Sequence, residues 1–102
     1  MRAVVIEAPA VLRVAELPDP EPGAGEVVVA VALTGVCGTD LHVLDGHFAT
    51  ARFPIVPGHE VTGTVVATGP GVTSPLPADR VVIDPGVPCM TCLLCRRGRP
   101  NL

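Results

Sequence analysis

Apolar residues along this chain gather in short stretches that Pro and Gly separate. Val dominates these stretches, and β-branched residues favour strands. Where the residues run apolar or alternate with polar ones, the pattern predicts a strand. We therefore expect five strands, over residues 3–6, 11–17, 26–36, 60–68 and 80–84. Many short strands at fairly regular spacing are typical of a small barrel or sandwich.

The stretch 26–36 is the longest of these patterns, and its near-continuous apolar character predicts burial on both faces. One short helical signal follows it. Thr39 or Asp40 could cap a helix that continues through Leu44, and Gly46 would end it. A break at residues 8–10 predicts a hairpin turn. The chain should therefore be mainly β, with one short helix.

Composition and charge narrow the possible functions. The 102 residues are 48% hydrophobic, which argues against intrinsic disorder. The net charge is −3, and the one basic cluster, at 96–99, has no aromatic stacking platform beside it, so we expect no nucleic-acid partner. The N-terminus lacks the apolar core of a signal peptide, and the longest apolar run, 27–33, is far too short to span a membrane.

We therefore expect a cytoplasmic protein with no membrane partner. Four Cys residues in a secreted chain would suggest a disulfide framework. In the cytoplasm, clusters of Cys more often bind metal than form disulfides.

Two short motifs carry candidate chemistry. Cys37 begins a Cys-Gly-Thr-Asp motif, and His59 lies in a Gly-His-Glu motif. Zinc binds Cys sulfur and His nitrogen readily, and a catalytic zinc keeps one coordination position open for substrate. Taken alone, either residue could instead be a small buried thiol or an unrelated loop imidazole.

A second cluster lies near the end of the chain, where Cys89, Cys92 and Cys95 repeat a Cys-x-x-Cys step. This spacing suits a tight loop around a tetrahedral structural zinc. The alternative is a redox pair, which would need a helix start in a thioredoxin-like context. Three thiols leave a closed zinc site one ligand short, so we expect the fourth ligand immediately after Leu102.

The order of these motifs resembles the N-terminal, GroES-like catalytic domain of the zinc-dependent medium-chain alcohol dehydrogenases. The matching motifs are Gly25-Glu26-Val27, Cys37-Gly38-Thr39-Asp40-x-His42, Pro57-Gly58-His59-Glu60, Gly63-x-Val65, Asp79-Arg80-Val81 and Cys89-x-x-Cys92-x-x-Cys95. The resemblance implies a mainly β, GroES-like, partly open β-barrel with one short helix and a zinc-knuckle lobe at the C-terminal end.

The resemblance also implies the organisation of the chain. Residues 1–102 would be the N-terminal part of the catalytic domain, with the structural-zinc lobe beginning at 85–102. The Rossmann domain would be absent, and the sequence agrees, since Gly69-x-Gly71 lacks the third glycine and the helix of a dinucleotide-binding motif. The full-length enzyme would transfer a hydride between a small alcohol or carbonyl substrate and NAD(P), with zinc as cofactor.

Several roles follow from the resemblance at the catalytic zinc. Cys37 and His59 match two of its ligands. Glu60 matches a carboxylate that lies behind the zinc and sometimes approaches it directly. Asp40 matches a carboxylate that orients the ligand imidazole, which metal-bound His nearly always requires.

Further roles concern the proton and the second zinc. Thr39 matches the hydroxyl that bonds the zinc-bound alcohol, and His42 matches the imidazole at the far end of a proton relay. A helix cap and a surface His are the simpler interpretations of these two residues. Cys89, Cys92 and Cys95 match three of the four structural-zinc ligands.

The sequence departs from the family pattern at Met90 and Ala78, which stand where glycine is common. Two other functions stay open: a GroES-like interaction domain, as in co-chaperonins, and a zinc-binding module without catalysis. We expect the chain alone to lack dehydrogenase activity. We also expect exposed strand edges and possible self-association.

Overall fold

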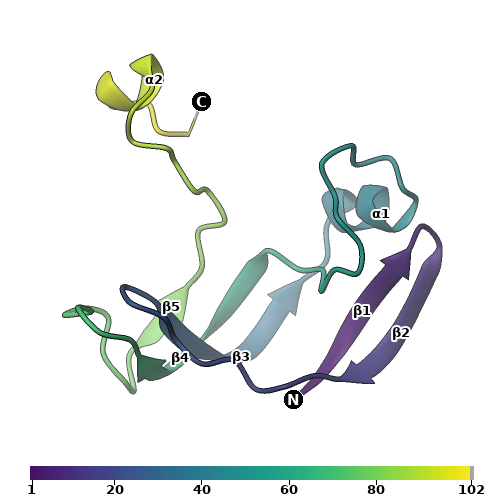
Figure 1. The fold of residues 1–102 in the computed structure, drawn as a ribbon, viewed down its shortest axis with the longest axis horizontal. Coiled ribbons are helices and arrows are strands. Elements are labelled where there is room, and N and C mark those ends of the chain that lie inside the picture. The colour runs from purple at the N-terminus through teal and green to yellow at the C-terminus, as the bar shows by residue number, and fades with distance from the viewer. Residues whose placement is uncertain (102) are drawn as a thin grey trace.

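The computed structural model describes residues 1–101 and contains two antiparallel sheets (Figure 1). The first sheet is a hairpin of β1 (Arg2–Ala8) and β2 (Val11–Glu16). The second has the strand order β3 (Val27–Gly35), β4 (Glu60–Thr68), β5 (Arg80–Val82). All five strands expected from the sequence are present, and β4 has the expected bounds.

The hairpin supplies much of the buried core. The expected turn joins its strands at residues 8–10, and Ile6 is only 1% exposed. Ile6 also exchanges two backbone hydrogen bonds with Ile55, of 2.8 and 2.9 Å, so the loop before β4 is fixed against the hairpin. The other buried apolar side chains are Val5, Ala15, Val43 and Val65.

The register of β3 against β4 positions the candidate site. Val27 pairs with Thr68 at one end, and Gly35 pairs with Glu60 at the other. Cys37 comes two residues after the end of β3, and His59 comes one residue before the start of β4. The antiparallel pairing therefore brings residues 22 positions apart in the sequence to the same end of the sheet.

The expectation that 26–36 is buried on both faces is wrong. Val31 is 59% exposed and Leu33 is 72% exposed. Within residues 1–101, β3 pairs only with β4 and forms an edge of its sheet. An apolar strand is buried only where another layer covers it, and no described element covers the second half of β3.

The helix α1 (Gly38–Leu44) begins at a different cap from the one expected. Cys37, and not Thr39 or Asp40, is the N-cap, with an extended backbone at φ −120° and ψ −178°. Its sulfur accepts from the N–H of Thr39, and Asp40 accepts from the N–H of Cys37, which makes a capping box. The Asp45 N–H bonds Leu41 O and closes the far end of the helix.

A second, shorter helix was not expected. The segment α2 (Leu93–Arg96) has four residues, and Cys92 is its N-cap. It stands apart from both sheets, at the end of an extended segment that leaves β5 (Figure 1). Residues 85–101 thus form a separate small lobe around the three Cys residues.

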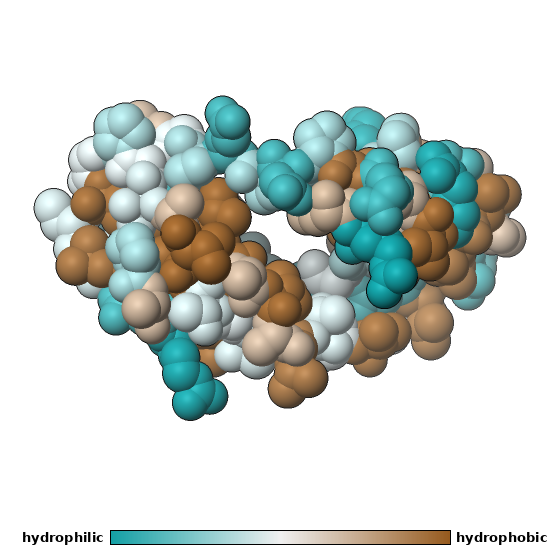
Figure 2. Space-filling view, turned by 90° about the horizontal axis from the view of Figure 1, so that it is seen from below, coloured by the Kyte–Doolittle hydropathy of each residue, from teal (hydrophilic) through white to brown (hydrophobic). Residues whose placement is uncertain are grey.

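A large hollow separates the two sheets, and Figure 2 shows apolar side chains on both sides of it. Its volume is about 780 Å³, and it is lined by the N-terminal half of β1 and by parts of β3 and β4. The sheets therefore do not close on each other, which agrees with a mainly β, partly open barrel. Neither helix of the described residues is long enough to cross a membrane.

Candidate metal centre

Cys37, Asp40 and His59 form one group whose possible ligand atoms lie within 4.8 Å of one another. Cys37 Sγ lies 3.3 Å from His59 Nε2. Sulfur and nitrogen atoms that share one tetrahedral zinc are roughly 3.5 Å apart, given their usual bond lengths to the metal. The thiol and the imidazole are therefore already spaced to hold a single zinc ion.

The carboxylate of Asp40 holds the two loops of this group together. Its Oδ2 accepts from the N–H of Cys37 at 2.9 Å, and its Oδ1 accepts from the N–H of Gly58 at 3.0 Å. Asp40 Oδ1 also lies 3.5 Å from His59 Nδ1. The carboxylate thus faces the ring nitrogen opposite Nε2, and this arrangement leaves Nε2 directed at the sulfur.

These contacts also influence the pKa of Asp40, whose side chain is buried. The hydrogen bond from the Cys37 N–H lowers the pKa of the Asp40 carboxyl, and the Gly58 N–H and His59 act in the same direction. Burial opposes them but does not outweigh them. Asp40 is therefore ionised at neutral pH.

Gly58 has a structural reason to be glycine. Its φ is +102°, a backbone conformation that residues with a Cβ rarely adopt. A Cβ at this position would also lie 2.9 Å from Thr34 Oγ1. This conformation presents the Gly58 N–H to Asp40 directly before His59, so the glycine belongs to the support of the site.

The other predicted residues lie around this group. Thr39 is half-buried and is the second residue of α1. His42 is exposed on the next turn of the helix, three residues on and on the same face. Glu60 is not part of the group, because its carboxylate lies over Gly35, its partner across the strands.

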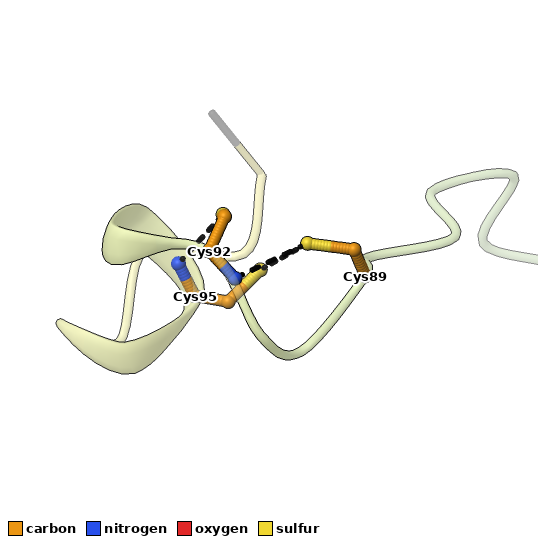
Figure 3. A group of neighbouring side chains, drawn as sticks. All are labelled: Cys89, Cys92 and Cys95. Carbon is orange, nitrogen blue, oxygen red and sulfur yellow. Dashed lines mark hydrogen bonds between the residues drawn. The ribbon is translucent and has the colours of Figure 1, made fainter.

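The three remaining Cys residues form a second group, with ligand atoms again within 4.8 Å of one another (Figure 3). Cys89 Sγ and Cys95 Sγ lie 3.9 Å apart. Two sulfurs on one tetrahedral zinc are roughly 3.8 Å apart. The spacing of the Cys89 and Cys95 sulfurs therefore fits two ligands of one zinc, and Cys92 Sγ lies within 4.8 Å of both.

Backbone N–H groups support these sulfurs. The Cys92 N–H donates to Cys89 Sγ at 3.4 Å, and the Cys95 N–H donates to Cys92 Sγ at 3.5 Å. Hydrogen bonding from the backbone of Thr91, and then of Cys92, lowers the pKa of the Cys89 thiol to about 6. Thiolates are the form that binds zinc, so the loop favours the ligand state.

The two residues that depart from the family pattern both have a left-handed backbone conformation. Ala78 has φ 79° and Met90 has φ 58°. Both are positions where the resemblance leads one to expect glycine, and both have the backbone that favours glycine. The chain therefore keeps the shape of these turns without the residue that adopts it most easily.

Sequence reasoning missed two parts of the site. One is the role of Cys37 as the helix cap, although Cys-x-x-Asp has the spacing of a capping box. The other is the Gly58 N–H, which joins the two motifs through Asp40. The glycine before His59 was a visible sign of an unusual backbone at this position. That its N–H bonds Asp40 could be found only from the fold.

The matching family model is the alcohol dehydrogenase GroES-like domain, over residues 23–102. Among curated relatives, the starvation-sensing protein RspB of Escherichia coli K12 is 44% identical over 102 residues. L-threonine 3-dehydrogenase of Saccharopolyspora erythraea is 47% identical over 106 residues. The alignments cover the whole of this chain but only 30% and 31% of those proteins.

Solved structures agree with this similarity. The crystal structure of RspB from Escherichia coli CFT073, described as a short chain alcohol dehydrogenase in complex with NADH, superposes with a TM-score of 0.89. It is 44% identical, and the match covers 99% of this chain and 29% of that one. The chain thus spans about 30% of the length of the relatives that it matches. This chain belongs to the alcohol dehydrogenase GroES-like domain family.

Proposed function

We propose that this chain is the N-terminal part of the catalytic domain of a zinc- and NAD(P)-dependent alcohol dehydrogenase. The family and the relatives support an oxidoreductase that acts on small alcohols. One observation carries the zinc assignment: Cys37 Sγ and His59 Nε2 lie 3.3 Å apart, with Asp40 behind the imidazole. An interaction domain without chemistry has no need of such a pair.

Zinc held here would act as a Lewis acid on the oxygen of an alcohol or carbonyl substrate. Cys37 and His59 would supply a thiolate and a neutral imidazole, two of the ligands that a catalytic zinc uses. Asp40 would keep the proton of His59 on Nδ1, so that Nε2 stays free to bind. Its two backbone hydrogen bonds fix the carboxylate for this task.

The proposed proton path uses two residues of α1. The Thr39 hydroxyl would accept the proton of the substrate alcohol and pass one on toward His42. The exposed position of His42, one turn along the helix, suits the solvent end of such a relay. Glu60 would act on the site only through its charge, given its position over Gly35.

The second zinc would be structural. Cys89, Cys92 and Cys95 would supply three thiolates, and a fourth ligand would come from chain that follows in longer family members. Hydride transfer in the whole protein would take place between the substrate and NAD(P), for which this chain has no dinucleotide-binding motif. The single domain would thus contribute the metal and the proton path.

Zinc titration of the purified chain against a competing dye tests the catalytic assignment. We expect His59→Ala to abolish one of two binding events, whereas the matched control His47→Ala, at an exposed residue outside both groups, leaves both unchanged. Asp40→Asn should weaken the same event by roughly 10- to 100-fold, as is typical when the partner of a metal-bound His is lost. Equal titrations for the His59 and His47 variants would refute the assignment.

A further inference from the structure

We propose that Cys89 and Cys95 form a reversible oxidation site: in the metal-free lobe they close into a disulfide and leave Cys92 as a thiol. The inference rests on the proposed zinc lobe only in that both use the same sulfurs. The observation behind it is the contact of 3.9 Å between Cys89 Sγ and Cys95 Sγ (Figure 3).

The positions of the three thiols select this pair. Cys92 Sγ is the N-cap of α2 and accepts the N–H of Cys95, so its recruitment would remove the cap of the helix. Cys89 precedes the helix in an exposed loop, where its sulfur accepts the Cys92 N–H but does not cap the helix. A disulfide requires its two sulfurs to approach to roughly 2.05 Å. A shift of the loop that carries Cys89 would achieve this without unwinding α2.

The chemistry needs a two-electron oxidant, and a hydroperoxide supplies it. The Cys89 thiolate attacks a peroxide oxygen, the O–O bond breaks, and a sulfenic acid forms as the other oxygen leaves as water or alcohol. The Cys95 thiol then attacks the Cys89 sulfur, and the sulfenic oxygen leaves as water. The two thiols lose two electrons and two protons, and the peroxide is reduced.

Such a disulfide would exclude zinc, because only one thiolate would remain in the lobe. Metal loss and oxidation would then be coupled, and a thiol reductant would reduce the disulfide back to two thiols by thiol–disulfide exchange, becoming a disulfide itself. The lobe would respond to peroxide only when it has released its metal. This gives the Cys89–Cys95 pair a regulatory role distinct from its structural one.

Met90 allows a direct test, because cyanogen bromide cleaves after it and separates Cys89 from Cys92 and Cys95. The full chain in a Cys37→Ser background is freed of metal, treated with limiting hydrogen peroxide and alkylated. We expect fragments 2–90 and 91–102 to stay joined until reduction. Tandem mass spectrometry of the joined product should find the alkyl group on Cys92.

Two matched variants in the same background separate the possible pairs. Cys92→Ser should keep the fragments joined, whereas Cys95→Ser should lose most of the linkage. An alkyl group on Cys95, or linkage lost in Cys92→Ser and kept in Cys95→Ser, would overturn the proposal. The mass spectrum of the three-thiol chain decides this even if a variant folds poorly.

A zinc-loaded sample tests the structural-zinc assignment separately from the proposed oxidation site. Protection of all three thiols by zinc would support the lobe as a metal site. If zinc gives no protection and the metal-free sample still forms the Cys89–Cys95 disulfide, the structural-zinc assignment fails and the oxidation site stands. If no disulfide forms in the metal-free sample, the oxidation site is refuted whatever zinc does.

Discussion

Asp40 is the residue on which the candidate metal centre depends most. It caps α1 through Cys37, holds the turn at Gly58 and faces the imidazole of His59. One carboxylate therefore stabilises both the fold and the geometry of two proposed ligands. The Asp40 carboxylate therefore contributes to the stability of the chain even without bound metal.

The first prediction concerns the pH dependence of this carboxylate. The contacts lower the pKa of Asp40 in the folded chain, so its stabilising effect is fully present above its ordinary pKa, which is roughly 4. The effect is lost as the pH falls through the lowered value of the folded state. Asp40→Asn should cost about 1.5–3 kcal/mol at neutral pH, the range for a hydrogen bond to a charged group.

Urea unfolding in the presence of a chelator measures this difference without the metal. The gap in free energy of unfolding between the wild type and Asp40→Asn should shrink as the pH falls from about 6 to about 3. Asp45→Asn, at the exposed end of the same helix, serves as the matched control. A gap that stays constant over this pH range would contradict the role given to the charge.

At the scale of elements, much of the fold could be predicted from local sequence. Strand β4 alternates clearly and ends at Thr68, directly before Gly69 and Pro70, so its bounds were predicted correctly. The burial of β3 could not be predicted, because it depends on which other elements cover the strand. Helix α2 has four residues, too few for a periodic signal.

In the candidate site, too, some features could be predicted from the local sequence and others depend on the fold. Zinc-binding residue types and their spacing are visible in the sequence. The approach of Cys37 to His59 is not, because it depends on the pairing of Gly35 with Glu60 between two distant strands. The cap at Cys37 was misassigned, since Cys is not among the residues that usually cap helices.

The second prediction concerns the turn before β5. Ala78 has φ 79°, and its N–H donates to Val65 O at 2.9 Å, so the left-handed residue fastens the turn to β4. Ala78→Gly should stabilise the chain by about 0.5–1 kcal/mol, because the relief of strain exceeds the added entropy of the unfolded chain. The control Ala24→Gly, at an exposed turn residue outside the left-handed region, should destabilise it. Thermal or urea unfolding of both variants measures the change in stability. A loss of stability in Ala78→Gly would contradict the strain argument.

The whole molecule is an open assembly of two sheets around a hollow, and it leaves many large apolar side chains exposed. Val31 and Leu33 lie on an edge strand, where unpaired backbone groups invite association. The chain also has no dinucleotide-binding motif of its own. Both features agree with the proposal that this domain supplies only part of an enzyme.

The third prediction is that the purified chain self-associates and has no dehydrogenase activity. Sedimentation velocity should show oligomers that increase with concentration. Leu33→Lys, on the exposed part of β3, should reduce them.

Alcohol oxidation with NAD or NADP should be undetectable, because nothing positions the nicotinamide against a substrate. A monomer with zinc-dependent activity would contradict this account.

The central claim is that Cys37 and His59 hold a zinc ion, and X-ray absorption at the zinc edge tests it most directly. The measurement uses a variant with Ser at positions 89, 92 and 95, which leaves Cys37 as the only thiol. We predict one bound zinc with a single sulfur ligand at about 2.3 Å and nitrogen or oxygen ligands at about 2.0–2.2 Å. Zinc that shows no sulfur ligand, or a variant that retains no zinc, would contradict the account.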